Sequence, residues 1–536
     1  MSNINLPEQF KTRMKEYLEV SYEAFIASYE TSEVKGIRLS SFFRGDGPFA
    51  MGSLPLDSAG DTDALGDVGS GFLDALGAGD GLIANWQKVP WCDNGYFLNA
   101  DDFNEIRPGK HPLHEAGAYY IQEPSAMAPV AYMDIRPGDR VLDLCASPGG
   151  KSTQIAALLR GEGILVSNEI MPDRAKILSE NIERMGVRNA LVISEDPRNI
   201  SDRFYGFFDK ILVDAPCSGE GMFRRSDVAI NEWSLDNVAN CAKRQEWILD
   251  EAAKMLRENG TLCYSTCTFS KEENELQIVN FLNRHEEFSL GEMTQFDGMR
   301  QGFAAGEYES VGIRIFPHEA NCEGHYLCKL VKKRRMSELR SESHVENDEE
   351  AFCLTGDRAS GELEHGAMCH DTRVIKAMPL GGFEPELSKK DAADLKEMYK
   401  FFDETFSEES DFTDYIKERK ITRFKDQVYL LPKECPKLDG LKVLRPGLHL
   451  GTILKNRFEP GHALAKCLSG YDVKRACILE PDGDEAKKYI AGETFNFDGD
   501  MPGWYVVFAG IYPLGWGKLT NPIMKNHYPK GLRKRL

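Results

Sequence analysis

Two cysteines in the sequence stand in polar turns that also carry hydroxyl side chains. Cys217 lies in Asp214-Ala-Pro-Cys217-Ser-Gly-Glu-Gly221, and Cys267 lies in Tyr264-Ser-Thr-Cys267-Thr. A buried cysteine is more often an inert, small apolar residue. Three others fit that description: Cys263, Cys328 and Cys477. A thiol in a polar turn can ionise to a nucleophilic thiolate, so Cys217 and Cys267 are candidates for covalent catalysis.

A glycine-rich turn precedes both cysteines in Asp143-Leu-Cys-Ala-Ser-Pro-Gly-Gly-Lys-Ser152. An apolar run leads into this turn and a helical segment, 152–159, follows it, so backbone N–H groups and the positive end of a helix face any ligand bound there. A nucleoside-triphosphate loop would need a glycine where Cys145 stands, and the dinucleotide glycine pattern is missing too. Many such turns are only structural, so this turn alone is a weak signal.

Acidic residues follow the next three apolar runs: Glu169, the pair 195–196, and Asp214. The carboxyl ends of parallel strands form the edge of the sheet where ligands bind, and an acid about 20 residues beyond the glycine turn is placed to bind ribose hydroxyls. Polar residues favour strand ends in any case, which leaves chance as an explanation. Together the acids suit a ligand with a ribose, an adenine amine and a cation, such as S-adenosylmethionine.

Two thiols beside a methyl donor favour methylation at the C5 atom of a pyrimidine. A thiolate that adds at C6 converts the base to an enamine, whose C5 can attack the methylsulfonium. Loss of the C5 proton and then of the thiol restores the aromatic ring. This chemistry alone leaves open whether Cys217 or Cys267 is the nucleophile.

Short apolar runs alternate with helical segments through the region that would position these residues. The predicted strands are 141–144, 164–166, 191–193, 210–213 and 261–264, and helices fit at 172–185 and 238–258. Such alternation predicts an α/β fold with a Rossmann-like core, in which a mostly parallel sheet carries helices on both faces. We assign this core to 113–331.

The flanking regions differ in composition from the core. Region 1–112 contains one or two helices within 7–34 and an insertion, 45–82, with ten Gly and seven Asp. Positions 61–72 begin like a calcium loop but end in Phe72 instead of Glu, so we predict no metal. Region 332–390 is a polar linker. Region 391–536 is globular again and predicts a small β-rich domain from about 427.

Composition and charge exclude several classes of protein. Of the 536 residues, 42% are hydrophobic and 10% aromatic, which excludes a wholly disordered chain. No apolar run reaches 18 residues, so no membrane span is expected. The net charge of −20 is concentrated in 45–82 and 337–365, whereas 501–536 has six Lys or Arg and no acid, so nucleic acid remains a possible partner. Thirteen scattered cysteines without a C-x-x-C pair fit a reducing cytoplasm.

Three motifs together resemble the Sun-family RNA cytosine-5 methyltransferases: Asp-x-Cys-Ala-x-Pro-Gly-Gly-Lys, Asp-Ala-Pro-Cys-Ser-Gly-Glu-Gly-Met-Phe and Ser-Thr-Cys-Thr-Phe. The resemblance extends to Tyr120-Ile-Gln-Glu-Pro-Ser-Ala-Met127 and to Arg314-Ile-Phe-Pro-His318. The end, 510–518 with 525–533, looks like the PUA-like domain of the bacterial small-subunit rRNA methyltransferases of the RsmF group. Most of the chain is covered, except 45–82 and about 335–390.

The resemblance implies a role for each motif residue. Cys267 is the nucleophile, Cys217 helps to expel the enzyme from the methylated product, and Asp214 and Lys151 complete the catalytic set. The residues expected to bind S-adenosyl-L-methionine are Cys145, Ala146, Ser147, Pro148, Gly149, Gly150, Lys151, Glu169, Asp196 and Asp214. Ser147 stands where Ala is commoner in the family, and the insertion 45–82 is the larger departure.

The expected partner is RNA, most of all small-subunit rRNA or the assembled subunit, bound by a monomer in the cytoplasm without DNA or membrane. A stacked base must be flipped or already single-stranded to reach both thiol and methyl donor. Candidate phosphate contacts are Arg224, Arg225, Arg314 and the tail 530–535, with Trp516 and Tyr528 nearby. The alternatives are the same chemistry on tRNA, or a catalytically silent RNA-binding ribosome-assembly factor.

Overall fold

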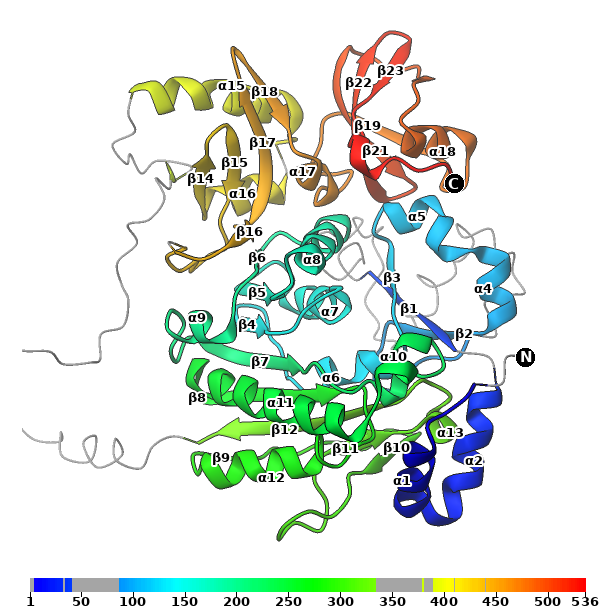
Figure 1. Cartoon of the computed structure of the whole chain (residues 1–536). Coiled ribbons are helices and arrows are strands. Elements are labelled where there is room, and N and C mark those ends of the chain that lie inside the picture. The colour runs from blue at the N-terminus through cyan, green and yellow to red at the C-terminus, as the bar shows by residue number, and fades with distance from the viewer. Residues whose placement is uncertain are drawn as a thin grey trace, which may run out of the picture.

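The computed structural model describes residues 4–31, 34–40, 86–333, 378–379, 389–408, 410–438 and 440–536. The predicted insertion 45–82, with its calcium-like stretch 61–72, lies outside these residues, and so does nearly all of the predicted linker 332–390. Figure 1 shows the core in the middle of the view, two C-terminal sheets above it and the N-terminal helices beside its lower edge.

The core is one ten-stranded sheet in the order β10-β11-β12-β8-β7-β4-β5-β6-β16, with β9 also paired to β12. The five predicted strands are confirmed and run parallel to one another: β4 (Arg140–Asp143), β5 (Ile164–Asn168), β6 (Ala190–Ile193), β7 (Phe208–Asp214) and β8 (Leu256–Thr266). Antiparallel strands extend both edges: β9 (Phe288–Leu290), β10 (Met299–Gln301), β11 (Ile313–Ile315), β12 (His325–Lys332) and β16 (Val443–Arg445). The α/β prediction is therefore confirmed.

Helices cover both faces of this sheet, as its residue pattern requires. Alternate residues of the central strands enter two apolar clusters, Leu142 and Ile211 on one face and Val141 and Leu212 on the other. Strands buried on both faces read as continuous apolar runs. The core helices are α6 (Ala128–Ala131), α7 (Gly150–Leu159), α8 (Pro172–Arg184), α9 (Pro197–Ser201), α10 (Asp227–Glu232), α11 (Leu235–Met255), α12 (Glu275–Arg284) and α13 (Pro317–Ala320).

The N-terminal region packs against the core through helices and a small sheet. The predicted helices are α1 (Glu8–Leu18) and α2 (Tyr22–Ala27), and their buried side chains, including Phe10 and Met14, share a cluster with Phe269 and Phe316 of the core. Strand β1 (Lys35–Leu39) lies between β2 (Gly95–Leu98) and β3 (Tyr119–Ile121), all antiparallel. Helices α4 (Ala100–Ile106) and α5 (Pro112–Glu115) complete this region.

The C-terminal region forms two five-stranded sheets. The first has the order β13-β14-β15-β17-β18 and the second β19-β21-β22-β23-β20. Its strands are β13 (Met378–Pro379), β14 (Lys420–Phe424), β15 (Gln427–Leu430), β17 (Leu448–Leu454), β18 (Arg457–Pro460), β19 (Ala476–Leu479), β20 (Phe495–Asn496), β21 (Gly503–Ala509), β22 (Tyr512–Thr520) and β23 (Ile523–Asn526). Its helices are α15 (Lys389–Thr405), α16 (Asp411–Lys417), α17 (His462–Lys466) and α18 (Asp484–Ala491).

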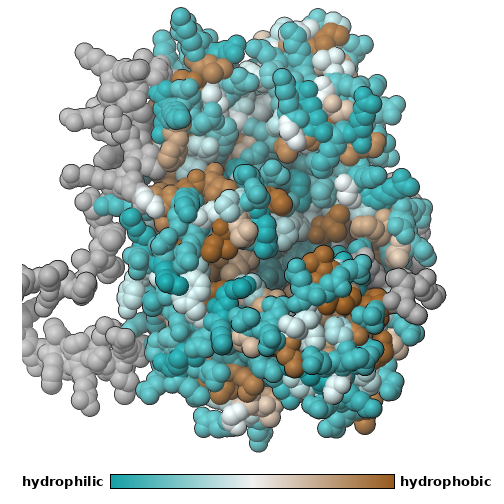
Figure 2. All heavy atoms as spheres, in the orientation of Figure 1, coloured by the Kyte–Doolittle hydropathy of each residue, from teal (hydrophilic) through white to brown (hydrophobic). Residues whose placement is uncertain are grey.

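The C-terminal region is joined to the core by hydrogen bonds as well as by apolar packing. Strand β16 pairs antiparallel with β6, and Arg445 of β16 forms an ion pair with Glu183 of α8. On the face drawn in Figure 2, apolar side chains lie in small groups among hydrophilic ones. In the part of the chain that the structure describes, no helix is long and apolar enough to cross a bilayer.

Candidate active site

The glycine-rich turn carries the chain from the end of β4 at Asp143 to the start of α7 at Gly150. Gly149 is the N-cap of α7 and has φ +113°, in the left-handed region that favours glycine. A Cβ atom there would also lie 3.2 Å from Cδ1 of Leu178 on α8. The turn therefore needs glycine at this point, and it leaves the N–H groups of the first turn of α7 open to a ligand.

A cavity of about 280 Å³ opens in front of this turn. Seven predicted cofactor residues line it: Cys145, Ala146, Ser147, Pro148, Gly150, Lys151 and Asp214. Asp143 and residues of the N-terminal region, including Lys35, Tyr120 and Gln122, line it as well. The cavity therefore lies between the carboxyl edge of the sheet and the strands β1 and β3, where an α/β sheet binds its ligands.

Asp214, the last residue of β7, is the charged centre of this edge. Its Oδ2 accepts a 2.7 Å hydrogen bond from Nζ of Lys151, its Oδ1 accepts one of 2.8 Å from Ser265, and Nε2 of His325 lies 3.4 Å from Oδ1. Burial opposes ionisation of this carboxyl, but the Lys151 charge and the His325 contact outweigh it and hold the pKa of Asp214 well below its usual range. Asp214 is therefore a carboxylate at neutral pH.

The two predicted thiols meet at this edge, with Sγ of Cys217 3.4 Å from Sγ of Cys267. Both side chains are half-buried. The hydrogen bond with Cys267, followed by burial, raises the pKa of Cys217 well above the ordinary value for a thiol. Burial lowers the pKa of Lys151, but Asp214 and, more weakly, Cys267 raise it, with a net rise. Lys151 therefore keeps its positive charge at this edge.

A buried carboxylate ties the two cysteine turns together. Glu273 accepts hydrogen bonds from the N–H and hydroxyl of Ser218, which follows Cys217, and a 2.8 Å bond from Gln245 of α11. The Ser218 hydroxyl is also 2.8 Å from that of Thr268, which follows Cys267. Burial raises the pKa of Glu273 to about 7. Each thiol is therefore held through its neighbouring residue.

Asp143 at the end of β4 tests whether the cavity fits the predicted cofactor. Its Oδ2 accepts a 2.6 Å bond from Ser152, while Oδ1 is buried without a hydrogen-bond partner among the described residues. Burial raises the pKa of this carboxyl to about 7. A buried carboxylate oxygen that faces a ligand cavity suits a cationic ligand group. S-adenosyl-L-methionine carries an ammonium and a sulfonium, so the residues present fit it.

The other predicted cofactor residues lie at the same edge of the sheet but do not line this cavity. Glu169 follows β5, is 5% exposed, and accepts a 2.9 Å bond from the N–H of Met171. Asp196 is the N-cap of α9, where it accepts a bond from the N–H of Arg198. Gly149 shapes the turn through its backbone. Their direct contact with a cofactor stays a prediction.

Two of the predicted phosphate contacts are wrong. Arg314 is 1% exposed and paired with Glu275, and the side chain of Arg224 is 4% exposed and paired with Glu323. An arginine already bound by a buried carboxylate cannot reach a phosphate. Arg225 lines the cavity.

The predicted aromatic support for the basic tail is also wrong. Trp516 and Tyr528 are each 2% exposed, and the Trp516 indole donates to the carbonyl oxygen of Gly461, so neither ring is available for stacking on RNA bases. Lys534 forms an ion pair with Glu115. RNA binding by the tail as a whole stays a prediction.

Sequence reasoning missed four residues that shape the site: Asp143, Ser265, Glu273 and His325. Asp143 opens the glycine-turn motif, so its place at the end of β4 was the available signal. His325 is the first residue of β12, and Ser265 precedes the Thr-Cys turn. Glu273 had no signal, because its side-chain partners, Ser218 and Gln245, lie in two other segments of the chain. Within the described ranges no group of His, Cys, Asp and Glu has the makings of a metal site.

Comparison with protein families divides the chain into four matching segments. The family described as 16S rRNA methyltransferase RsmB/F matches 130–331, and the N-terminal domain of 16S rRNA methyltransferase RsmF matches 80–124. The first C-terminal domain of RsmF rRNA methyltransferase matches 402–468, and the methyltransferase RsmF PUA domain matches 477–534. Both candidate thiols and the whole glycine turn lie in the first of these segments.

The chain is also similar to individual curated proteins and to solved structures. Ribosomal RNA small subunit methyltransferase F of Vibrio vulnificus strain YJ016 is 30% identical over 83% of this chain and 85% of its own length. A solved structure titled NSun6 from Pyrococcus horikoshii with SFG aligns with 62% of this chain and 100% of its own, at 20% identity and a TM-score of 0.49. Ribosomal RNA small subunit methyltransferase F of Vibrio campbellii is 31% identical over 99% of this chain and 98% of its own length. The chain therefore belongs to the RsmF family of 16S rRNA methyltransferases.

Proposed function

We propose that this chain methylates C5 of a cytosine in small-subunit rRNA, with S-adenosyl-L-methionine as its cofactor, through a covalent bond between Cys267 and C6 of the base. One observation carries the proposal: two thiols lie 3.4 Å apart at the sheet edge that also holds the ligand cavity and Lys151. A thiol pair beside a polar ligand site suits a reaction in which one sulfur adds to the base and the other assists its release.

The cofactor is held by the glycine turn and the acids around it. The turn 145–151 offers the N–H groups at the start of α7, and Asp143 offers its free oxygen to the ammonium group. Glu169 and Asp196 would bind the ribose and adenine regions, as in the family. When bound, S-adenosyl-L-methionine supplies the methyl group.

Cys267 is assigned as the nucleophile because the two thiols differ in their surroundings. Cys217 has its pKa raised by the contact with Cys267, so it remains a thiol and can donate its proton toward the other sulfur. The Lys151 ammonium, paired with Asp214, interacts electrostatically with Cys267. Cys217 acts after the methyl group has been transferred and the C5 proton has been lost. Its thiol then donates toward the Cys267 sulfur as that thiolate leaves C6 and the ring becomes aromatic again.

Asp214 and Lys151 act on the base as well as on the thiol. The exocyclic amine of cytosine is a hydrogen-bond donor, and the ionised Asp214 is an acceptor at the same edge. Addition of a thiolate places negative charge on the ring, which the Lys151 ammonium stabilises. Arg225, beside the cavity, and the basic tail are the proposed phosphate contacts.

The first experiment is a covalent-adduct assay on wild type, Cys217→Ala and Cys267→Ala, each mixed with cofactor and RNA from cells that lack the enzyme. We expect Cys217→Ala to form an RNA adduct that survives a denaturing gel and Cys267→Ala to form none. Cys241→Ala, a buried thiol on α11, is the matched control and should behave as wild type. An adduct in Cys267→Ala instead would reverse the two roles while leaving the reaction intact.

The substrate is tested by methyl incorporation into purified small subunits, bulk tRNA and single-stranded DNA. We expect methyl incorporation into the small subunit and none into DNA. We also expect the enzyme to act as a monomer, in the cytoplasm where ribosomes assemble. Labelling of tRNA alone would contradict the rRNA assignment. RNA binding without cofactor binding in a calorimeter would favour the silent assembly factor, although intact Cys217, Cys267, Asp214 and Lys151 speak against it.

A further inference from the structure

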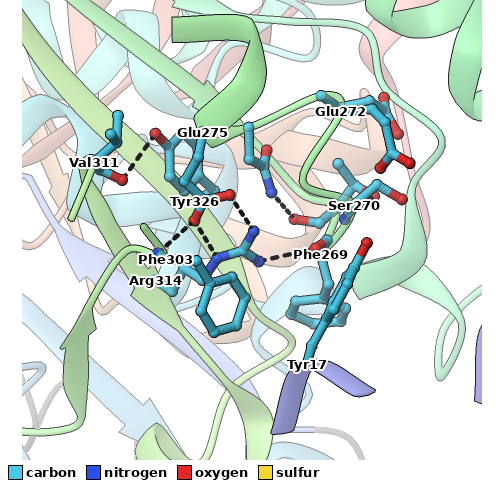
Figure 3. Close-up of polar contacts among 12 residues, drawn as sticks. Tyr17, Phe269, Ser270, Glu272, Glu275, Phe303, Val311, Arg314 and Tyr326 are labelled. Atoms are coloured by element: carbon cyan, nitrogen blue, oxygen red, sulfur yellow. Dashed lines mark hydrogen bonds and ion pairs between the residues drawn. The ribbon is translucent and has the colours of Figure 1, made fainter. Parts of the chain in front are cut away.

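Arg314, in the middle of β11, binds a buried carboxylate through a bidentate ion pair. Its Nε and Nη2 each donate a 2.6 Å hydrogen bond to Glu275, one to each carboxylate oxygen. Arg314 is 1% exposed and Glu275 is fully buried. Figure 3 shows the guanidinium between this carboxylate and the loop that bears Phe269. The centroid of the Phe303 ring lies 4.4 Å from the guanidinium carbon, so the charge also packs against an aromatic face.

The third guanidinium nitrogen of this arginine contacts the turn that carries Cys267. Nη1 donates a 2.9 Å hydrogen bond to the backbone oxygen of Phe269, two residues after Cys267. The backbone oxygen of Cys267 accepts a 2.8 Å bond from the N–H of Gly221, at the end of the other cysteine turn. A Cβ atom at Gly221 would lie 2.9 Å from that same oxygen, so the two turns are in close backbone contact.

The start of α12 links the same arginine to both sides of the nucleophile. Asn274, immediately before Glu275, accepts a 2.6 Å bond from the Thr266 hydroxyl and donates a 2.9 Å bond to the Thr268 oxygen. Arg314 therefore fixes Glu275 from one side and the Phe269 oxygen from the other. The segment 266–269, with the thiol at its centre, cannot shift without breaking one of these bonds.

Stability alone does not account for such an ion pair. Replacing a buried pair with apolar residues of similar volume is often neutral or stabilising, because the cost of removing two charges from water can exceed their attraction. What an apolar pair could not supply is the donor to the Phe269 oxygen. The directional fork of arginine is suited to holding a backbone in one place.

We propose that Arg314 is a positioning residue that holds the Cys267 thiol against the target base, with Glu275 as the anchor of its guanidinium. This inference rests on the proposed function, in which Cys267 is the nucleophile. A displacement of about 1 Å in a reacting group can cost about 100-fold in rate. Loss of the fork should therefore slow bond formation while both ligands still bind.

The test is Arg314→Lys, which keeps the positive charge and removes the fork. Arg140→Lys is the matched control, because Arg140 pairs with Asp209 at the start of β4, the opposite edge of the sheet from the thiols. In the Cys217→Ala background we expect Arg314→Lys to form the RNA adduct about 10- to 100-fold more slowly. Dissociation constants for RNA and cofactor should stay within about twofold, and Arg140→Lys should match its parent.

Hydrogen exchange over 265–272 supplies a readout that needs no substrate. We expect faster exchange of these amides in Arg314→Lys than in Arg140→Lys, with the rest of the core sheet unchanged. Equal adduct rates in the two variants, with only the unfolding temperature lowered, would overturn the proposal and leave Arg314 a structural residue.

A second variant covers the case in which Arg314→Lys does not fold. The double substitution Arg314→Met with Glu275→Leu removes both charges and leaves apolar side chains. A folded double variant with a slow adduct supports the proposal, and one with the parental rate overturns it. If Cys217→Ala itself forms no adduct, the assigned roles of the thiols fail, while the effect of Arg314→Lys on wild-type methyl transfer still decides the inference.

Discussion

Two clusters of buried charge in this chain differ in what they face. At the carboxyl edge of the core sheet, Lys151 and Asp214 border a cavity of about 280 Å³, and Asp143 beside them keeps an oxygen without a partner among the described residues. At the junction of the N-terminal and C-terminal regions, Lys466 donates to the backbone oxygens of Glu115 and Pro513, and the Glu115 carboxylate accepts from Tyr528 and Lys534.

The first cluster is a ligand site. The second, formed by Glu115, Lys466, Tyr528 and Lys534, connects two parts of the chain, and we call it the joint. Charges that line a cavity retain bonding capacity for a ligand, whereas charges that bind each other and the backbone hold two parts of the chain together. Substitutions at the first cluster should therefore change the rate of methyl transfer more than stability. Substitutions at the second should change stability more than rate.

Lys151→Met should have the largest effect. It removes the cation that faces both Asp214 and Cys267, so single-turnover methyl transfer should fall by about 100- to 1,000-fold, as when one preorganised donor is lost from an active site. Lys176→Met is the control, because that lysine forms only an exposed ion pair on α8. A Lys151→Met enzyme within twofold of wild type would remove this cluster from the catalytic site.

Glu115→Gln should act on stability with a defined pH dependence. Burial opposes ionisation of Glu115, but hydrogen bonds from His114 and Lys534 outweigh it and lower the pKa to about 2 from 4.5. A carboxyl whose pKa is lower in the folded state stabilises above its unfolded pKa and loses that contribution as the pH falls. The loss in Glu115→Gln should be about 3 kcal/mol at pH 7 and should shrink between pH 4.5 and 2.

Urea unfolding of wild type and Glu115→Gln at several pH values measures this effect. Glu180→Gln, at an exposed position on α8, serves as the control and should change little. A stability difference that is independent of pH would show that Glu115 contributes by packing and not by charge. Methyl transfer at neutral pH should remain within about twofold of wild type, because Glu115 does not line the cavity.

Lys466→Met should have a smaller effect on the same joint. Burial lowers the pKa of Lys466 well below its ordinary value, so the amine already costs the native protein free energy through desolvation. Methionine relieves that cost but leaves the oxygens of Glu115 and Pro513 without their donor. We expect a net loss of about 2 kcal/mol in the free energy of unfolding, with methyl transfer unchanged. A loss of activity at full stability would contradict the assignment of Lys466 to a joint.

The active-site edge was largely predictable because its residues are local in sequence. Cys217, Cys267 and Asp214 each lie at or just beyond the end of an apolar run, and parallel topology brings such ends together. The glycine turn could be recognised from its own residues. What the sequence did not show is that the two sulfurs lie 3.4 Å apart, since 50 residues separate them.

Long-range pairing explains the predictions that failed. Arg314 and Arg224 look like exposed arginines, but their carboxylate partners lie 39 and 99 residues away in the sequence. Strand β16 joins the core sheet beside β6 from about 250 residues further along the chain, and no local pattern in 443–445 indicates that partner. Such contacts depend on tertiary packing, which periodicity and spacing do not encode.

The smallest predicted effect concerns the pH dependence of cofactor binding at Asp143. Burial raises the pKa of this carboxyl from 3.8 to about 7, so the cofactor-free chain loses stability as the pH rises from 3.8 to 7, where the carboxyl is ionised in the unfolded chain but still protonated in the folded one. An ammonium group binds the ionised form, and an α-amine stays charged below about pH 7.7. Affinity should therefore rise with pH, and the dissociation constant should fall about tenfold between pH 5.5 and 7 as the ionised fraction grows.

Calorimetry in buffers of different ionisation enthalpy checks this prediction directly, because binding should release a proton at pH 6. Asp143→Asn should bind more weakly at pH 7 and show neither the pH dependence nor the proton release. A cofactor dissociation constant that does not change with pH in wild type would mean that Asp143 does not face the ammonium. Asp214 would then be the only one of these two carboxylates that attracts the cationic cofactor. A clear pH dependence would instead show that Oδ1 of Asp143 binds the ammonium group of the ligand. Both carboxylate oxygens of Glu115, by comparison, accept hydrogen bonds from the protein itself.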